Sequence, residues 1–448
     1  MRIEVVATPS RSYENIVKDL EKRISGDVDP KLLLVFFTES VWDCYERVLE
    51  YLKSRYPDAR MAGCFIEGYC TPRDSWMRGL VLMLIDAEGV EVFHAKGRKA
   101  SDTFGRLGEV VGGGWSSVIL IYPAFYFTNR YDMSKVGLRD RVYSMVYGRL
   151  RGLEKKRGIL RRYSRFLESK YIYPIDKALR SFGGEAPVVS MNLMPMEAKC
   201  ETPVVLADYE RIGRGAVAVC FKGKTNTVFH DVHPERGNSF EETLEILKGC
   251  YPNVEEVNVV KGGVVIGEID GMAPVKFLES KVRAYRVMGQ EVVLDKLVKG
   301  KLQTVTPYGL AFVSRETYGA SMLGLMSYPV NLYPSIFTLE DFYDKCLFLG
   351  EFYKDGFRRY MELFDKKKFD DSFDIIMIDH NVIPMFGKRI HTIMKQIKDF
   401  SNEFLLLITS FPSCRKTSEN RRYLSQVYDD TFINLTGTSA MIEIKELR

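Results

Sequence analysis

The sequence predicts an α/β protein, in the wider α+β sense with mixed sheets, built from two related α/β halves. Short apolar runs such as KLLLVFF at 31–37 have the length and composition of buried strands. They alternate with segments such as 41–56, in which apolar residues recur at helical spacing. With 46% hydrophobic and 27% charged residues, the composition is that of an ordinary globular protein.

The length of the chain predicts more than one domain. Its 448 residues exceed what a single ordinary core holds. The strand and helix pattern breaks near 300–310, in KGKLQTVTPYG. We therefore predict a first domain over 1–300 and a second over 301–448.

In the first domain, the elements alternate in type along the chain. A helix over 41–56 ends at Pro57-Asp58 and is followed by the strand ARMAGCF. Two apolar runs, 79–86 and 90–95, are separated by AEG and predict a hairpin. Further elements are a helix over 101–111, a strand over 118–127, and one long or broken helix over 139–170.

From about residue 186 the pattern becomes rich in short β runs separated by Gly, Asn and Pro, which favours antiparallel hairpins. A helical pattern over 273–299 closes the first domain. In the second domain, the sequence predicts a charged amphipathic helix or helix pair over 337–368 and strands over 373–380, 404–411 and 432–444. A further helix is predicted over 414–428, between the last two strands.

Charge is concentrated in residues 139–170. This segment holds eleven Lys and Arg against three Asp and Glu, a net of +8, so a chain total of +5 leaves about −3 for the rest. A general nucleic-acid binder is usually basic beyond one segment, so nucleic acid is an unfavoured partner. A solvated face and an acidic protein partner both stay open.

Targeting signals are not apparent. The chain has no run of 18 uncharged apolar residues, which argues against a membrane span, and no apolar stretch of the kind that a secretory signal needs near its start. Its eight cysteines are sparse for the length, so reduced thiols and a cytoplasmic location are predicted. Only four glutamines occur, a weak indication of a hot habitat.

Signatures of phosphate and metal sites are incomplete. GKT at 223–225 lacks the glycine that a phosphate-binding loop needs at 218, and a hairpin turn is the better interpretation. His230 and His233 would point to opposite faces of a strand, so a shared metal is not predicted. We predict no metal and no cofactor.

The segment ARMAGCFIEGYC at 59–70 is the main functional candidate. Cys64 could be a nucleophile, as could Cys414, with His380 as the base, but a buried cysteine that only packs is the commoner case. Glu67 follows an apolar strand among glycines, where an unpaired buried carboxylate is unfavourable. It therefore faces either water or a cation, and no catalytic residue is assigned.

This segment resembles the FIST domain family, whose members carry a Gly-Cys element followed by Gly and Glu after the second strand. GCFIEGY agrees at Gly63, Cys64 and Gly68, with Tyr69 in the place of Glu. KGGVVIGEIDGMAPV resembles a later family element. The end of the chain, with TSFPSCRKTSEN and NLTGTSAMIEI, resembles the family's C-terminal half.

The resemblance implies a sensor that binds small ligands such as amino acids and acts on a signalling partner. We expect a pocket where the glycine-rich strand ends of the two halves meet, with Glu and Arg holding a zwitterion. The predicted ligand-binding residues are Gly63, Cys64, Glu67 and Gly68 from one half, and Cys414, Arg415, Gly437 and Glu443 from the other.

Overall fold

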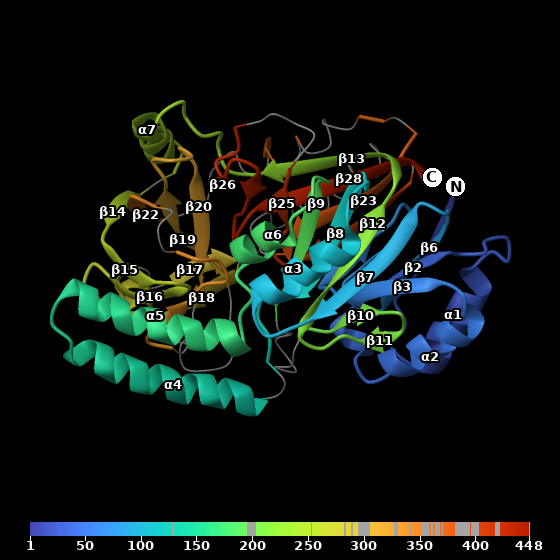
Figure 1. Cartoon of the computed structure of the whole chain (residues 1–448), viewed down its shortest axis with the longest axis horizontal. Helices are drawn as coiled ribbons and strands as arrows, with labels where there is room; N and C mark the ends of the chain where they lie inside the picture. Colours follow the sequence, from blue (N-terminus) through green and yellow to red (C-terminus); the bar gives the residue numbers. More distant parts are fainter. Residues whose placement is uncertain are drawn as a thin grey trace.

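The computed structural model describes most of the chain. The described residues are 1–127, 130–194, 203–251, 253–281, 284–287, 290–293, 305–326, 330–339, 343–350, 371–380, 403–416 and 422–447, with Arg358, Arg359, Glu362, Lys368, Phe369 and Lys395 between them. Three large sheets and a side lobe make up the molecule, with helices on the outside (Figure 1).

The first sheet has the order β1-β6-β2-β3-β10-β11. β2 and β3 run parallel, whereas β6 is antiparallel to β1 and β2. All six residues of β2 are buried, because α1 (Tyr13–Arg23) and α2 (Tyr45–Arg55) cover one face of the sheet and the main core covers the other. The strands are β1 (Arg2–Thr8), β2 (Leu32–Phe37), β3 (Arg60–Phe65), β6 (Leu80–Asp86), β10 (Val205–Ala207) and β11 (Glu210–Arg211), and a short 3-10 turn, η1 (Glu39–Val41), precedes α2.

The second sheet has the order β26-β27-β25-β9-β8-β12-β7. Here β8 and β9 are the parallel pair. Two helices, α3 (Ala100–Val111) and α6 (Ile175–Phe182), lie on its outer face (Figure 1). The strands are β7 (Val90–Lys96), β8 (Ser117–Pro123), β9 (Val188–Leu193), β12 (Gly215–Phe221), β25 (Ser413–Arg415), β26 (Gln426–Tyr428) and β27 (Thr431–Phe432).

The third sheet has the order β13-β28-β23-β24-β4-β5. Its parallel pair is β23 and β24. The strands are β4 (Gly68–Cys70), β5 (Ser75–Trp76), β13 (Gly223–Asp231), β23 (Phe373–Asp379), β24 (Phe404–Thr409) and β28 (Thr438–Leu447).

One strand order occurs three times. The four-stranded units β1-β6-β2-β3, β7-β12-β8-β9 and β13-β28-β23-β24 share the same pairing: two antiparallel pairs and then a parallel one. The short strand after each unit pairs with the next unit in a closed circle, β4 on β24, β25 on β9 and β10 on β3. The sequence predicted two related parts, and the structure contains three.

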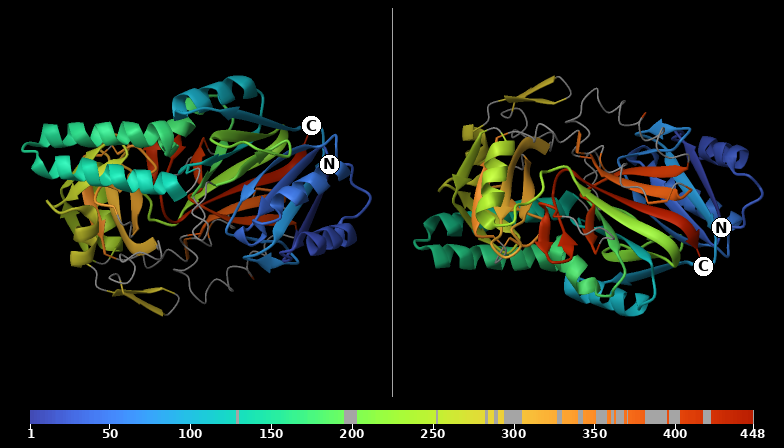
Figure 2. Two further views of the ribbon diagram at one scale, coloured as in Figure 1. Left: turned by 90° about the horizontal axis from the view of Figure 1, so that it is seen from below. Right: turned by 90° about the horizontal axis from the view of Figure 1, so that it is seen from above.

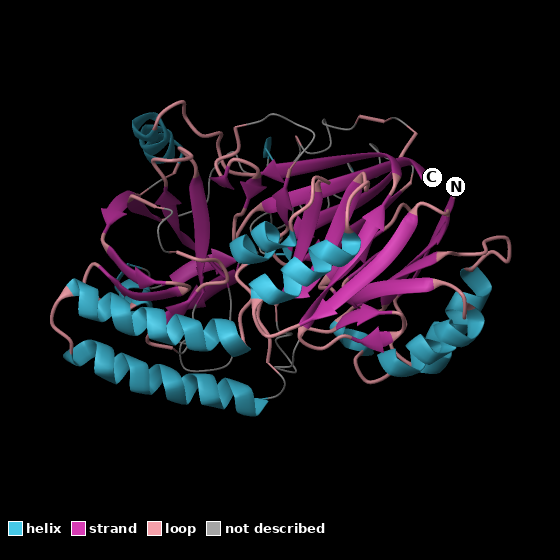
Figure 3. Cartoon of the chain, in the orientation of Figure 1, coloured by secondary structure: helices cyan, strands magenta, loops and turns pink. Residues whose placement is uncertain are grey.

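The three units share one hydrophobic core. Its buried side chains come from all three sheets and include Phe36, Ile121, Val217, Met377 and Ile442. Burial of apolar surface stabilises a protein by about 25 cal/mol per Å². The hydrophobic effect in this common core is therefore the main interaction that holds the three units together. Figures 2 and 3 show the sheets closing around it, with the chain ends near one another.

A side lobe lies in the chain between β13 and β23. It packs on a helical hairpin, α4 (Arg130–Arg149) and α5 (Leu153–Lys170), which is inserted between β8 and β9 (Figure 1). The lobe's elements are α7 (Phe240–Cys250), α8 (Pro274–Lys281), β14 (Val254–Val257), β15 (Val259–Gly262), β16 (Val265–Ile269), β17 (Ala284–Val287), β18 (Gln290–Val293), β19 (Val305–Val313), β20 (Ala320–Met326), β21 (Tyr333–Pro334) and β22 (Lys345–Leu349).

The predicted fold class, mixed α/β, is confirmed, and the basic segment is a broken helix as predicted. Two predicted hairpins are wrong. β6 and β7 belong to different sheets, and so do β12 and β13, because each strand pairs with partners far away in the sequence. GKT is not a hairpin turn but the first three residues of β13. The helix predicted over 273–299 stops at Lys281, where the hairpin of β17 and β18 follows. The helices predicted over 337–368 and 414–428 are wrong where the structure describes them, because β22 lies in the first segment and β25 and β26 lie at the two ends of the second. The predicted boundary at residue 300 lies outside the described residues, whereas residues 305–310 of the predicted break belong to β19, and the two domains stay a prediction.

Candidate functional site

The four predicted site residues of the first half lie where the chain passes from the first sheet to the third. Gly63 and Cys64 are buried in β3, and a Cβ at Gly63 would collide with the Val35 carbonyl. Gly68 begins β4 and pairs with Ile408. The Glu67 side chain is exposed, although its backbone N–H donates to the Ile408 carbonyl at 3.0 Å. The glycines therefore serve strand packing, and Glu67 faces solvent.

Glu443 is satisfied by the protein itself. Its carboxylate is completely buried in β28. It accepts hydrogen bonds from the backbone N–H groups of Lys368 at 2.8 Å and Phe369 at 3.0 Å, and from the Asn226 side chain. A carboxylate with three donors holds a chain segment in place and needs no ligand cation.

Arg415 and Cys414 are also engaged within the protein. The Arg415 guanidinium donates to the carbonyls of Leu179 at 2.9 Å, Gly183 and Gly184, which lie at the end of α6 and just beyond it. Cationic donors at a helix C-terminus satisfy its last carbonyl groups. The Cys414 side chain is completely buried, as is that of Cys64, and burial raises the pKa of both thiols. Neither is an activated nucleophile.

Gly437 is the predicted site residue that lies next to a pocket, since its neighbour Thr436 lines that pocket. It has φ +79°, and a side chain there would collide with Val232. Its N–H donates to the buried carboxylate of Asp379 at 2.8 Å. The structure thus does not gather the eight predicted residues around one cavity, but it places Gly437 beside the pocket described next.

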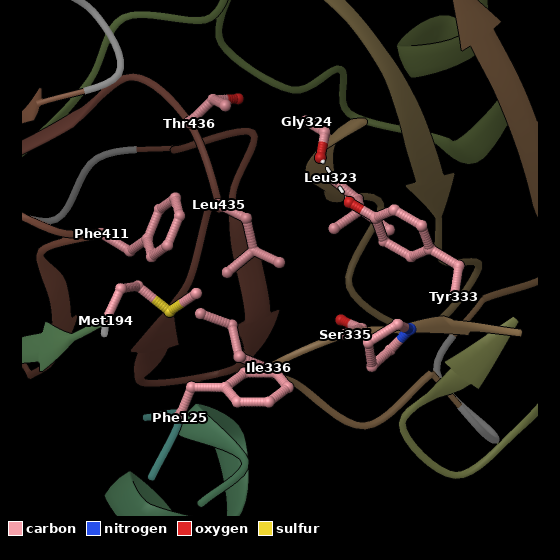
Figure 4. Close-up of a pocket in the computed structure, with 11 residues that line it drawn as sticks. Phe125, Met194, Leu323, Gly324, Tyr333, Ser335, Ile336, Phe411, Leu435 and Thr436 are labelled. Carbon is pink, nitrogen blue, oxygen red and sulfur yellow. Dashed lines mark hydrogen bonds between the residues drawn. The ribbon is translucent and has the colours of Figure 1, made fainter. Parts of the chain in front are cut away.

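A small pocket of about 20 Å³, which is room for about one water molecule, lies between the three-unit body and the side lobe. Its walls are mainly apolar and aromatic, and Figure 4 shows Phe411 and Met194 facing Leu323 and Tyr333 across it. The Tyr333 hydroxyl donates to the Gly324 carbonyl at 3.2 Å. Small-molecule sites are usually apolar and lie at such boundaries, although they are larger than this pocket. The lining residues are Phe125, Met194, Leu323, Gly324, Tyr333, Pro334, Ser335, Ile336, Phe411, Leu435 and Thr436.

Phe411 marks the place where this pocket meets the third sheet. Its φ of +41° is unusual for a bulky residue and indicates local backbone strain. Its carbonyl accepts a hydrogen bond from the buried Asn192 side chain, and its ring centroid is 6.0 Å from that of His380. The turn between β24 and β25 is thereby fixed with the Phe411 ring in the pocket wall.

Polar residues gather at this end of the third sheet. The last paired residues of β23 and β24 are Asp379 and Thr409, and β28 begins with Thr438 and Ser439; all four are buried. Within the described part of the chain, four polar atoms at or near this end lack a hydrogen-bond partner. They are Thr409 Oγ1 and Ser439 Oγ in the third sheet, His380 Nδ1, which lies 3.7 Å from the Asp379 carboxylate, and Asn192 Oδ1, which belongs to β9 of the second sheet. Unsatisfied buried polar groups are unfavourable, and they call for an explanation such as a ligand.

The other two units show that the fold does not require polar residues here. In the first unit, the corresponding strands β2, β3 and β6 have Phe37, Phe65 and Leu80 as their paired end residues. In the second unit, the ends of β8 and β9 are Pro123 and Leu193. Since the directly paired end residues are apolar in both other units, the architecture itself does not require Asp379 and Thr409 to be polar.

His233 joins the pocket to the lobe. Its Nε2 lies 3.0 Å from the Thr436 carbonyl and therefore donates to it, which leaves Nδ1 to accept from the Tyr251 hydroxyl. Burial lowers the pKa of His233 and keeps the ring neutral. Residues 230 and 233 have different partners, and in the described ranges no group of His, Cys, Asp and Glu is arranged to hold a metal ion.

The pocket wall formed by residues 333–336 is anchored by the first turn of α6. The Ile175 N–H donates to the Ile336 carbonyl at 2.8 Å, and the buried carboxylate of Asp176 accepts from the Thr338 N–H at 2.8 Å. Burial raises the pKa of Asp176 to about 6. The protonation state of Asp176, which holds the pocket wall through Thr338, therefore changes near pH 6.

The free energy of unfolding is expected to fall by on the order of 2–3 kcal/mol as the pH rises from about 4 to above 6. The reason is that Asp176 loses its proton at a lower pH in the unfolded chain than in the folded protein. Asp176→Asn cannot ionise and should flatten this part of the profile. Urea unfolding of both proteins at several pH values measures it. Identical pH profiles for the two proteins would contradict the assignment.

Comparison with known proteins identifies the family. Residues 31–272 match the FIST N domain, and residues 241–354 match the C-terminal domain of an AF0772-like protein. The chain belongs to the FIST family. An uncharacterized protein of Archaeoglobus fulgidus is 31% identical over 381 residues, which is 85% of this chain and 99% of that relative. The resemblance drawn from GCFIEGY is confirmed, and the second match in this FIST protein coincides largely with the side lobe.

The polar strand ends of this FIST protein are not among the residues predicted from the sequence. Thr409-Ser410 directly follow a buried apolar strand, and so does His380, which was noted only as a base. Polar residues directly after a buried strand were the available signal. As for the bilayer, none of the helices in the described ranges is both long and apolar enough to cross one.

Proposed function

We propose that this FIST protein is a sensor that binds a small molecule in the pocket between the three-unit body and the side lobe, that the pocket widens to admit the ligand, and that the protein acts through a partner protein. The observation that carries the proposal is the set of unsatisfied polar groups at the end of the third sheet, beside an apolar cavity. The family match supports a small-ligand role in general terms.

The pocket's chemistry favours a ligand with an apolar body and a compact polar head. Aromatic and aliphatic side chains would hold the body. The polar head would meet the strand ends at Thr436, Gly437 and Asp379, where backbone and carboxylate groups are close together. An apolar amino acid or a related metabolite has this shape, and its ammonium group suits the Asp379 carboxylate.

A thermal-shift screen tests the proposal. We expect amino acids with apolar side chains to raise the melting temperature more than Ser, Asp or Lys, because a ligand that binds only the native state stabilises it. Leu435→Trp would fill the pocket and should remove the shift. Leu153→Trp is the matched control, since this side chain is exposed on the helical hairpin, away from the pocket.

The decisive comparison is between the two tryptophan variants. If Leu435→Trp folds and keeps the full ligand-induced shift, the ligand binds elsewhere and the proposed site is wrong. If the shift is lost in both variants, the effect is not specific to the pocket, which also contradicts the proposal.

A further inference from the structure

Helix α4 has two different faces. One face packs on α5 and on the lobe: the ring of Tyr143 stacks on that of Tyr163 with centroids 4.8 Å apart, and a side chain at Gly267 would collide with Tyr147. In Figure 1, α4 lies on the side of α5 that is away from the lobe strands. The second face of α4 is therefore directed outward.

The outward face is apolar. Leu138 is 63% exposed and Met145 is 57% exposed, and their spacing of seven residues puts them on one stripe of the helix, with Val142 between them. Tyr131 and Val146 are exposed on the same helix. A contiguous apolar stripe of this kind on a soluble protein usually marks an interaction site.

The charges around this stripe are positive. Lys135, Arg139, Arg141 and Arg149 are all exposed along α4. Its two carboxylates are withdrawn from the surface, since the Asp132 side chain is 14% exposed and Asp140 is buried. An occupant of this face therefore needs apolar residues and negative charge.

The same helix is bound to the wall of the proposed ligand pocket. The buried Asp140 carboxylate accepts hydrogen bonds from the backbone N–H groups of Asn331 and Leu332, both at 2.9 Å. The next residues along the chain, Tyr333 and Pro334, line the pocket. A shift of this segment on ligand binding would reach α4 directly.

We propose that the outer face of α4 is a docking surface for an acidic amphipathic helix of a partner protein. This rests on the proposed function in that it supplies the sensor's output surface. A second copy of this chain is disfavoured as the occupant, because symmetric pairing would bring the cations of the two stripes together. An acidic helix instead satisfies the apolar stripe and its positive border at once.

The probe is a fluorescent synthetic helix of about 18 residues, long enough to cover five turns, with Leu on one face and Glu beside it. Fluorescence anisotropy of the ligand-free, full-length protein should give saturable binding that weakens as sodium chloride is raised. The matched peptide with Lys in place of Glu should not bind.

Two surface variants test the two parts of the recognition. Leu138→Ser with Met145→Ser, and separately Arg141→Glu with Arg149→Glu, should each weaken peptide binding about tenfold or more, since they remove central anchors or reverse the charge. Val110→Ser, which changes an exposed apolar residue on α3, is the control and should bind normally. Circular dichroism checks that each variant is folded.

Several results would overturn the proposal. Equal binding of the lysine peptide, no binding of the glutamate peptide, or unchanged binding by both double variants would each exclude an acidic helix as the occupant. Binding to phosphatidylserine vesicles without binding of the peptide would assign the face to a membrane. A dimer that Leu138→Ser dissociates would assign it to a second copy. A failed ligand screen changes none of these results, so the failures of the two proposals are distinguishable.

Discussion

Replacing Glu443 with alanine is expected to lower the free energy of unfolding by about 3–5 kcal/mol, because three donors lose their acceptor in a buried site. The donors are the backbone N–H groups of Lys368 and Phe369 and the side-chain amide of Asn226. Urea unfolding followed by circular dichroism measures the loss. The destabilisation should be independent of any small ligand.

Glu443→Gln is the control, because its amide oxygen can still accept from the two backbone groups. We expect a smaller loss of about 1–2 kcal/mol, since the charge and the hydrogen bond from Asn226 are lost but the two backbone groups keep their acceptor. If Glu443→Ala were as stable as the natural protein and lost only ligand binding, the residue would be a ligand contact, as the sequence first suggested, and not a structural acceptor.

Replacing Thr409 with valine is expected to produce two effects of opposite sign. The buried hydroxyl has no hydrogen-bond partner within the described residues, so its removal should raise the free energy of unfolding by about 1–2 kcal/mol. The same change should weaken ligand binding about tenfold or more, because a hydroxyl kept unsatisfied in the free protein is available to the ligand. Denaturant unfolding and ligand titration by calorimetry measure the two quantities.

Thr227→Val is the matched control for this prediction. Thr227 is as well buried as Thr409, but its hydroxyl is hydrogen-bonded to Ser117 at 2.9 Å. This variant should therefore lose about 1 kcal/mol of stability and bind ligand normally. A Thr409→Val protein that loses stability in the same way would show that its hydroxyl is structural.

Much of the secondary structure could be predicted from local pattern. KLLLVFF and FLLLI are short, uninterrupted apolar runs, and both form buried strands. The basic segment is helical, as its apolar residues at helical spacing predict. Strand partners could not be predicted in this way. β6 and β7 adjoin in the sequence and yet join different sheets, because β6 pairs with β1 and β2 near the start of the chain, whereas β7 pairs with β12 much later in the chain.

The candidate site was predictable in its region but not in its residues. Glycines near a carboxylate or a cation predicted Glu443, Arg415 and Gly437 as site residues. The sequence cannot show that Glu443 and Arg415 already have hydrogen-bond partners within the protein. The opposite holds for Thr409 and Ser439, whose only signal in the sequence is a polar residue at the end of an apolar strand. Only the structure reveals that they are buried without partners, at strand ends that are apolar in both other units.

Ligand binding in the pocket is tested most directly by soaking crystals of this FIST protein with the compound that gives the largest thermal shift and determining the crystal structure. The account predicts ligand density in contact with Phe411 and Leu435, with a polar group within hydrogen-bonding distance of the strand ends at Thr409 or Asp379. Density against Glu67, or anywhere else with the pocket empty, would contradict it.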